Sequence, residues 1–278
     1  MALKLIAAAS SFELLHLADK INKSFYHKVY LFQKVIKRFK SIMTKVKDAM
    51  TIKAVIFDLD GTIASFNIDY RAVRADVRSF LIKRGLPASV LSINESIFEM
   101  LKKTEIFMKN NGKSEKTMME TRDKALAIAE KYELEAAKTT SLLPGVLETL
   151  KALKKMDLKI GLCTINSEKS TNYILKRFGI AEFFNAVTPR DSVKYVKPNT
   201  EHLEAALKAL GVNPEEAIVI GDGAIDMRCA KELKAIAVGL PTGVSSPKEL
   251  ISSGANYFIT SITDLPTLIG YINKTTEV

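Results

Sequence analysis

Two aspartates separated by one residue, Asp58 and Asp60, directly follow an apolar run that ends at Phe57. A carboxylate held in line with a phosphorus atom can displace an alcohol and form an acyl phosphate, which divides one difficult displacement into two easier ones. Asp58 is the candidate for that nucleophile. Asp60, in the irregular turn that follows, can protonate the leaving oxygen and later deprotonate the attacking water. Alone the pair is only a weak signal for phosphoryl transfer, because aspartates after a strand are often turn or helix caps.

Two other segments carry side chains that suit the same reaction. Thr164 closes the apolar run 159–163, and its hydroxyl can donate to a phosphoryl oxygen alongside the amide of Ile165. Lys197, which precedes a proline, can supply a fixed positive charge to the transition state. Each has a plainer alternative, because a threonine after a strand often caps a helix and a lysine before proline is often a solvated loop residue. Asp222 and Asp226 follow a further apolar run and add two acids.

Four segments resemble, in this order, the motifs of the haloacid dehalogenase-like hydrolase superfamily: 58–62, Thr164, 197–198 and 221–226. The resemblance covers about residues 51–260. The resemblance implies a Mg2+ site formed by Asp58, the backbone carbonyl of Asp60 and Asp222, with Asp226 as a further ligand or next to one. Mg2+ prefers oxygen ligands and neutralises the phosphoryl charge that would repel a carboxylate. Residues beside the catalytic segments are assigned to substrate binding: Gly61, Thr62, Ile165 and Asn166.

The acid at position 60 narrows what the resemblance implies. Members of the superfamily that cleave carbon–halogen bonds or pump ions lack an acid at the second position, so Asp60 favours a phosphatase or a phosphomutase. The chain also departs from the family pattern, since Val196 stands where glycine is common and residues 233–235 replace a usual Ala-Gly pair. Neither departure touches a catalytic atom, but both leave the substrate open.

The elements that must position these residues are predicted from periodicity. The run 52–57 is short, β-branched and apolar, which is typical of a buried parallel strand, and open α/β sheets bind ligands at the carboxyl ends of such strands. Strands and helices then alternate through the C-terminal half. This predicts an α/β fold, a Rossmann-like parallel sheet with helices on both faces. The predicted elements are strands at 183–187, 217–220, 235–238 and 257–259, and helices at 201–210 and 226–233; a further helix is expected to begin at Pro144.

Three regions follow from these patterns: a basic amphipathic helical extension at 1–49, a catalytic core at 50–65 and 142–278, and a helical cap at 66–141. Within the cap, apolar residues recur at helical spacing at Tyr70, Val73, Val77 and Leu81. Arg71, Arg74 and Arg78 fall on one side of the same helix. They could hold a second anionic group of the substrate, or form a solvated basic face. A cap that closes would shield an acyl phosphate from water.

The formal net charge of +10 is concentrated in the extension, where ten Lys and Arg stand against three Asp and Glu. The remainder is only mildly basic, so the charge gives no reason to expect a nucleic-acid partner. The two cysteines, Cys163 and Cys229, lie in apolar settings and are expected as buried thiols, which favours a reducing, cytoplasmic compartment. No apolar run is long enough to span a bilayer.

The extension itself carries apolar residues at a helical period from Ile21 onward, with lysines between them. Such a helix over residues 21–49 could lie on an anionic membrane surface or dock on a protein partner. Met50 directly precedes the first catalytic strand, so the extension could also be upstream sequence without a role. We therefore expect it to be dispensable for chemistry.

These observations favour a Mg2+-dependent phosphatase of a small phosphorylated metabolite, similar to the phosphoglycolate phosphatase-like members of the superfamily. A sugar phosphomutase would use the same aspartates but return the phosphoryl group to the substrate. A non-catalytic binding protein on this scaffold is the third hypothesis, and the four intact acids argue against it. The oligomeric state is left open by the sequence.

Overall fold

The computed structural model describes residues 34, 37, 51–65 and 67–275. From Ile52 onward the chain forms one compact unit. The predicted basic helix at 21–49, and with it the predicted membrane or protein contact, lies outside the described residues except for Lys34 and Lys37.

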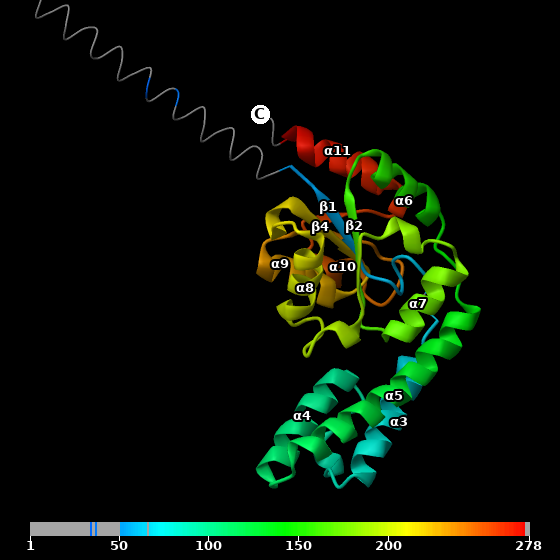
Figure 1. Ribbon diagram of the computed structural model, residues 1–278, viewed down its shortest axis with the longest axis vertical. Helices are drawn as coiled ribbons and strands as arrows, with labels where there is room; N and C mark the ends of the chain where they lie inside the picture. Colours follow the sequence, from blue (N-terminus) through cyan, green and yellow to red (C-terminus); the bar gives the residue numbers. More distant parts are fainter. Residues whose placement is uncertain (1–33, 35–36, 38–50, 66, 276–278) are drawn as a thin grey trace, which may run out of the picture. The chain divides into compact units, whose positions relative to one another are not determined.

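The central element is a six-stranded, all-parallel sheet with the strand order β3-β2-β1-β4-β5-β6. The first strand lies in the middle, between β2 and β4, so the chain builds outward from it in both directions (Figure 1). This confirms the predicted α/β fold. The strands are β1 (Ala54–Phe57), β2 (Lys159–Cys163), β3 (Ala186–Thr188), β4 (Ala217–Gly221), β5 (Ile236–Gly239) and β6 (Tyr257–Phe258).

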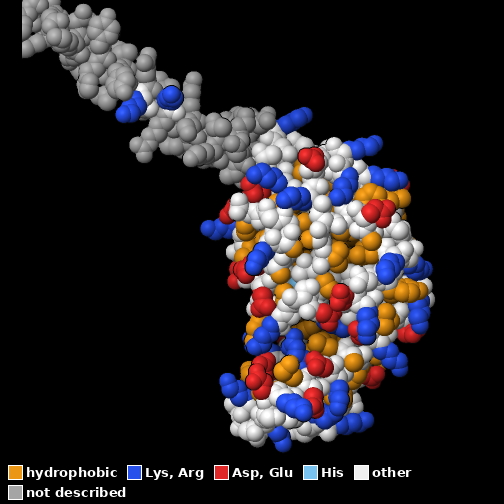
Figure 2. Space-filling view, in the orientation of Figure 1, with side chains coloured by type: hydrophobic (Ala, Val, Ile, Leu, Met, Phe, Trp, Pro, Cys, Tyr) orange, Lys and Arg blue, Asp and Glu red, His pale blue; other side chains and the backbone are white. Residues whose placement is uncertain are grey.

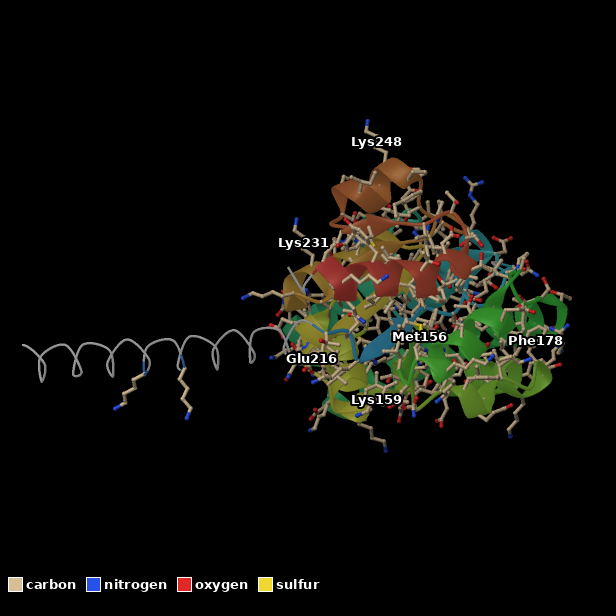
Figure 3. The ribbon with its side chains drawn as sticks, turned by 90° about the horizontal axis from the view of Figure 1, so that it is seen from above. Met156, Lys159, Phe178, Glu216, Lys231 and Lys248 are labelled. Atoms are coloured by element: carbon tan, nitrogen blue, oxygen red, sulfur yellow. The ribbon has the colours of Figure 1, made fainter. Side chains whose placement is uncertain are left out.

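Both faces of the sheet are covered, because successive side chains of a strand point to opposite sides and every residue of β1 is apolar. Val55 and Phe57 belong to one apolar cluster and Ala54 and Ile56 to another. The first cluster packs on α6 (Val146–Lys155), α7 (Glu168–Arg177) and α11 (Leu265–Thr275). The second packs on α8 (Thr200–Leu210), α9 (Ala224–Leu233) and α10 (Pro247–Ser252). Figure 3 shows these layers from the end of the sheet at which the strands begin. Lys159 is the first residue of β2, Met156 lies shortly before β2, and Glu216 directly precedes β4.

Three helices lie between β1 and β2 in the chain, within residues 66–141: α3 (Tyr70–Lys83), α4 (Ile97–Asn110) and α5 (Glu115–Thr139). Each begins at a side chain that accepts from the first turn, namely Asp69, Ser96 and Ser114. They share an apolar cluster that includes Val73, Val77 and Leu81, which confirms the helical spacing predicted for α3. Helix α5 is long enough to reach the core as well, where it packs against α7 (Figure 1).

The chain leaves and re-enters the core at neighbouring residues. The amide of Ser65 donates to the carbonyl of Ser141 at 2.8 Å, and the two serine hydroxyls lie 2.8 Å apart. Ala64 forms an antiparallel bridge with Leu142. The two connections between the core and the helical insertion are therefore hydrogen-bonded to each other.

Most predicted boundaries agree with the structure to within two residues, and the differences at Pro144 and at 183–187 have a visible cause. The helix after Pro144 begins at Val146, because Gly145 adopts a left-handed conformation (φ 81°) as its N-cap, and a Cβ there would lie 2.3 Å from the Thr263 side chain. Residues 183–187 are not one strand, since the chain first makes the short 3₁₀ turn Ala181–Phe183 and enters β3 only at Ala186. Other 3₁₀ turns are Ala88–Val90, Arg190–Ser192, Pro214–Glu216 and Ile262–Asp264.

The surface of this unit carries both signs of charge, and Figure 2 shows Lys and Arg interspersed with Asp and Glu over the visible face. Cys163 and Cys229 are buried free thiols, as predicted. None of the helices in the described part of the chain has the length and apolar character needed to cross a bilayer.

Candidate active site

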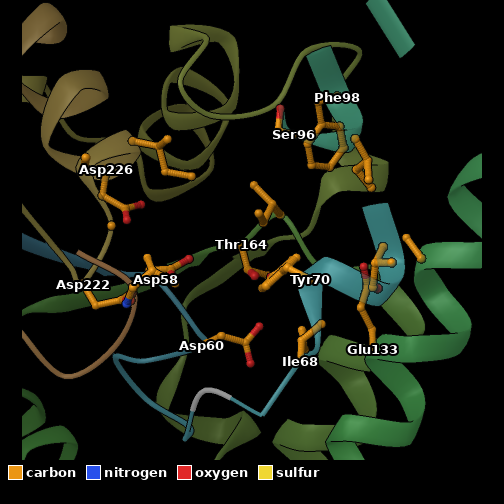
Figure 4. Close-up of a pocket in the computed structure, with 18 of the residues that line it drawn as sticks. Asp58, Asp60, Ile68, Tyr70, Ser96, Phe98, Glu133, Thr164, Asp222 and Asp226 are labelled. Atoms are coloured by element: carbon orange, nitrogen blue, oxygen red, sulfur yellow. The ribbon is translucent and has the colours of Figure 1, made fainter. Parts of the chain in front are cut away.

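Three neighbouring strands deliver the candidate catalytic side chains to one edge of the sheet. Asp58 follows β1, Thr164 follows β2 and Asp222 follows β4, and in the sheet β1 lies between the other two. Because the strands are parallel, their carboxyl ends meet at the same edge. Figure 4 shows Asp58, Asp222 and Asp226 gathered on one side of a cavity there, with Asp60 and Thr164 beside them.

Lys197 is buried and connects two of these acids, Asp58 and Asp226. Its side chain is 3% exposed, and its ammonium donates to Asp58 at 2.8 Å, to Asp226 at 2.6 Å and to the carbonyl of Cys163 at 2.7 Å. Burial acts to lower the pKa of Lys197, but the carboxylates of Asp226 and Asp58 outweigh it, so the pKa lies well above its ordinary value. Lys197 is therefore a permanent cation at the base of the site, and it is not a solvated loop lysine.

The carboxylates of Asp58, Asp222 and Asp226 offer oxygen atoms that all lie within 4.8 Å of one another. Burial and the charges of neighbouring carboxylates raise the pKa of Asp222, and burial raises that of Asp226 although Lys197 opposes the rise. One ammonium does not balance three carboxylates at this spacing. An all-oxygen donor set with excess negative charge fits a hard divalent cation such as Mg2+.

Asp60 occupies a different environment from Asp58. Its carboxylate accepts a hydrogen bond of 2.6 Å from the side-chain amide of Asn166, and the residue is buried. Burial, followed by the charge of Asp58, raises the pKa of Asp60 to about 8. At neutral pH Asp60 is therefore mostly protonated, the state from which a general acid acts.

The turn after Asp60 is shaped by its neighbours. Gly61 has φ 76°, and a Cβ there would lie 2.6 Å from the carboxylate of Asp222, so only glycine fits. The carbonyl of Gly61 accepts from the hydroxyl of Thr242. The hydroxyl of Thr62 is buried and has no partner among the described residues.

Thr164 does not cap the helix that follows it. The N-cap of α7 is Ser167, whose hydroxyl accepts from Ser170, whereas the hydroxyl of Thr164 accepts from the amide of Asn166 at 3.2 Å. The Thr164 hydroxyl proton can therefore be donated elsewhere. Thr164 and Ile165 line the cavity.

The cavity has a volume of about 270 Å³ and lies between the acids and the helical insertion. Of the three arginines singled out in α3, Arg74 lines it, while Arg71 is exposed and lies off its wall. Arg78 is used within the insertion, since its guanidinium donates to the carbonyls of Leu91 (2.9 Å) and Ala88 (3.1 Å).

Several wall residues were not predicted as site residues. Glu133 of α5 is buried, with one carboxylate oxygen accepting from Arg190 and the other from the amide of Ser167 at 2.9 Å. For Tyr70 the sequence predicts only a place on the apolar face of α3. The sequence carries no signal for Glu133, which stands among other charged residues of a helix. Other unpredicted members of the wall are Ile68, Ser96, Ile97, Phe98, Ala129, Val244 and Ser245.

Comparison with known proteins gives a consistent result. Residues 52–234 match the family model of the haloacid dehalogenase-like hydrolases. The pyrophosphatase PpaX of Listeria innocua is 26% identical over 221 residues, which cover 78% of this chain and 96% of the relative. PpaX of Bacillus cereus is 30% identical over 184 residues, covering 64% of this chain and 78% of the relative.

Solved structures share the fold. A β-phosphoglucomutase from Clostridium difficile superimposes with a TM-score of 0.57 at 22% identity, covering 81% of this chain and 98% of the other. A predicted phosphoglycolate phosphatase from Haemophilus somnus gives a TM-score of 0.53 at 20% identity, covering 78% of this chain and 97% of the other.

Proposed function

Because the chain belongs to the haloacid dehalogenase-like hydrolases, we propose that it hydrolyses a small phosphate monoester, with Asp58 as the nucleophile and Asp60 as the general acid and base. The observation that carries this proposal is the contrast between two aspartates two residues apart. The carboxylate of Asp58 lies 2.8 Å from the ammonium of Lys197, while Asp60 is buried away from that ammonium, and burial raises its pKa to about 8. The two carboxyl groups therefore have different environments, as the roles of nucleophile and general acid require.

In the first half of the reaction, a carboxylate oxygen of Asp58 forms a bond to phosphorus as the bond to the leaving oxygen breaks. The proton of Asp60 passes to that oxygen, and the alcohol leaves. In the second half, Asp60 accepts a proton from water as the water oxygen bonds to phosphorus and the bond between phosphorus and the Asp58 oxygen breaks. Inorganic phosphate leaves and both aspartates return to their starting states.

The other residues of the site have supporting roles in this scheme. Lys197 supplies positive charge beside Asp58, and Thr164 can donate its hydroxyl proton to a phosphoryl oxygen next to the amide of Ile165. Mg2+, held by Asp58, Asp222 and the backbone carbonyl of Asp60 with Asp226 beside them, would supply the charge that lets a carboxylate approach a phosphoryl group. The excess of carboxylates over ammonium groups supports this assignment. We propose that residues 66–141 act as the cap over this site.

The substitution Asp58→Asn tests the nucleophile, because the amide keeps the shape but removes the nucleophilic charge. Phosphate release from p-nitrophenyl phosphate with Mg2+ should fall below about 1% of the wild-type rate, since loss of a covalent catalyst costs several kcal/mol. A phosphoryl group should no longer be trapped on the protein.

Asp123→Asn is the matched control, since Asp123 is exposed on α5 and away from the cavity. It should leave turnover unchanged. Residual turnover of the folded Asp58→Asn protein well above 1% would rule out Asp58 as the nucleophile.

A further inference from the structure

The helical insertion presents a largely apolar wall to the phosphoryl-transfer residues. The apolar and aromatic side chains that it contributes to the cavity are Ile68, Tyr70, Val73, Ile97, Phe98 and Ala129. The core adds Ile165, Ile225 and Val244. In Figure 4, Phe98 and Ile68 lie across the cavity from the acids Asp58, Asp222 and Asp226. The part of a substrate that points away from the phosphoryl group therefore meets mainly carbon.

Two polar residues of this wall are already engaged within the protein. The hydroxyl of Ser96 accepts from the amide of Glu99 at 3.2 Å and bonds the Glu99 carboxylate, which caps α4. Both carboxylate oxygens of Glu133 are occupied, one by Arg190 and the other by the amide of Ser167. Ser96 uses its one donor on Glu99, and the carboxylate of Glu133 has no donor, so neither side chain can donate a hydrogen bond to a substrate hydroxyl.

Arg74 is the one cationic side chain among the described residues that line the cavity. It is half-buried, and it makes no hydrogen bond or ion pair with any other residue that the structure describes. Arg78, one turn further along α3, differs because two carbonyls hold its guanidinium. A partly desolvated guanidinium with free donors on an apolar wall is suited to one planar anion.

We propose that the substrate is a phosphate monoester whose alcohol part is mainly apolar, aromatic or branched, and carries a single carboxylate that pairs with Arg74. The inference rests on the proposed function and names its substrate class. A sugar phosphate fits poorly, because each hydroxyl left without a partner lowers kcat/KM by roughly 10- to 100-fold. The inference thus also speaks against a sugar phosphomutase.

The test compares three esters with Mg2+: 4-carboxyphenyl phosphate, phenyl phosphate and glucose 6-phosphate. We expect the wild-type kcat/KM to be about 10- to 100-fold higher for the carboxylate-bearing ester than for phenyl phosphate, because a charge-assisted hydrogen bond contributes a factor of that size. Glucose 6-phosphate should be at least about tenfold poorer than phenyl phosphate.

The substitution Arg74→Gln should remove the preference for the carboxylate, because it should lower kcat/KM much more for 4-carboxyphenyl phosphate than for phenyl phosphate. Lys83→Gln is the matched control, because it removes one positive charge from an exposed position of the same helix. It should change neither rate. An equal loss on both aryl esters in Arg74→Gln, loss of the preference in Arg71→Gln instead, or glucose 6-phosphate as the best ester would overturn the proposal.

Equilibrium binding separates this inference from the proposed function. Calorimetry of 4-carboxyphenyl phosphate and phenyl phosphate with the Asp58→Asn protein measures recognition without turnover. If the wild type released phosphate from none of the esters, yet the carboxylate strengthened binding about tenfold only when Arg74 is present, the hydrolase mechanism would fail and the ligand class would stand. Equal binding of both aryl esters would overturn the ligand class.

Discussion

Lys197 is held at both its backbone and its side chain. The ammonium bonds two carboxylates and a carbonyl, while the backbone amide donates to Nδ1 of His202 at 3.4 Å. The other ring nitrogen of His202 lies 3.1 Å from the carbonyl of Thr188, which also accepts from the amide of Thr164. His202 thus joins the segment of Lys197 to the strand end beside Thr164, and it does so as a neutral imidazole with its proton on Nε2.

This arrangement gives a pH-dependent stability. Burial, together with the charge of Lys197, lowers the pKa of His202 to about 4, whereas the unfolded chain binds that proton near pH 6.5. Between these values the unfolded state carries more protons, so stability is lost as pH falls from about 6.5 towards 4. From pH 7 to pH 5 this single group should cost about 2 kcal/mol.

The measurement is the free energy of unfolding in urea at pH 7 and pH 5, for the wild type and for His202→Gln. A glutamine amide can replace both hydrogen bonds but cannot be protonated. Other groups titrate in both proteins, so the difference between the two pH responses isolates His202. Identical responses would show that His202 is not held neutral.

At this scale the sequence shows which polar residues directly follow a buried strand, and such residues are expected at one edge of the sheet. Asp58, Thr164 and Asp222 have that position, and the structure brings them together with Asp60, Lys197 and Asp226. Glu133 could not be predicted, because its burial results from the docking of α5 on the core and leaves no local pattern. Arg71, Arg74 and Arg78 share one side of a helix, and only the tertiary structure separates their environments.

At the scale of elements, α5 is attached to the core through a buried ion pair. Arg190, in the turn after β3, donates to Glu133 and also to the carbonyls of Leu126 on the same helix and of Ile165, each at 3.3 Å. Since Ile165 and Glu133 both line the cavity, this contact sets the position of the wall relative to the catalytic edge.

Arg190→Met should therefore destabilise the protein by about 3–5 kcal/mol, because it leaves the Glu133 carboxylate buried without its counterion. Adding Glu133→Gln should restore part of that loss, since the amide keeps the bond from Ser167 and removes the charge. Urea unfolding at pH 7 measures both.

The control uses a second ion pair between α5 and the core. Lys169 of α7 and Glu130 of α5 lie 2.8 Å apart, with the lysine side chain 75% exposed. Lys169→Met should cost less than about 1 kcal/mol. Similar losses for Arg190→Met and Lys169→Met, or no recovery in the double variant, would contradict this view of the contact.

The elements themselves were predictable to the extent that their cause is local. The parallel fold was predicted correctly, because buried strands such as 217–220 are continuous apolar runs between turn residues. The two boundary differences at 144–146 and 183–187 arise at turns that the periodicity does not show. Gly145 is the left-handed N-cap of α6, at a position where a Cβ would meet Thr263. The 3₁₀ turn Ala181–Phe183 precedes β3.

At the scale of the whole molecule, every residue placed at the site lies within the compact unit that begins at Ile52. A chain that begins at Met50 should therefore fold and hydrolyse its ester with kcat/KM within about threefold of the full chain, since that factor corresponds to only about 0.7 kcal/mol. Circular dichroism checks the fold and phosphate release the activity. A folded but inactive shortened protein would mean that residues 1–49 contribute to the site.

The hydrogen bonds between Ser65 and Ser141 affect how the helical insertion can change in length during evolution. Closing a loop between two points already in contact costs little more for a long insertion than for a short one. A helical segment of another length or shape that also supplied a partner for Arg190 would therefore leave the register of β1 and β2 unchanged. The acids and Lys197 belong to the core and most of the apolar wall to the insertion, so under the proposed function the chemistry and the choice of substrate can change separately.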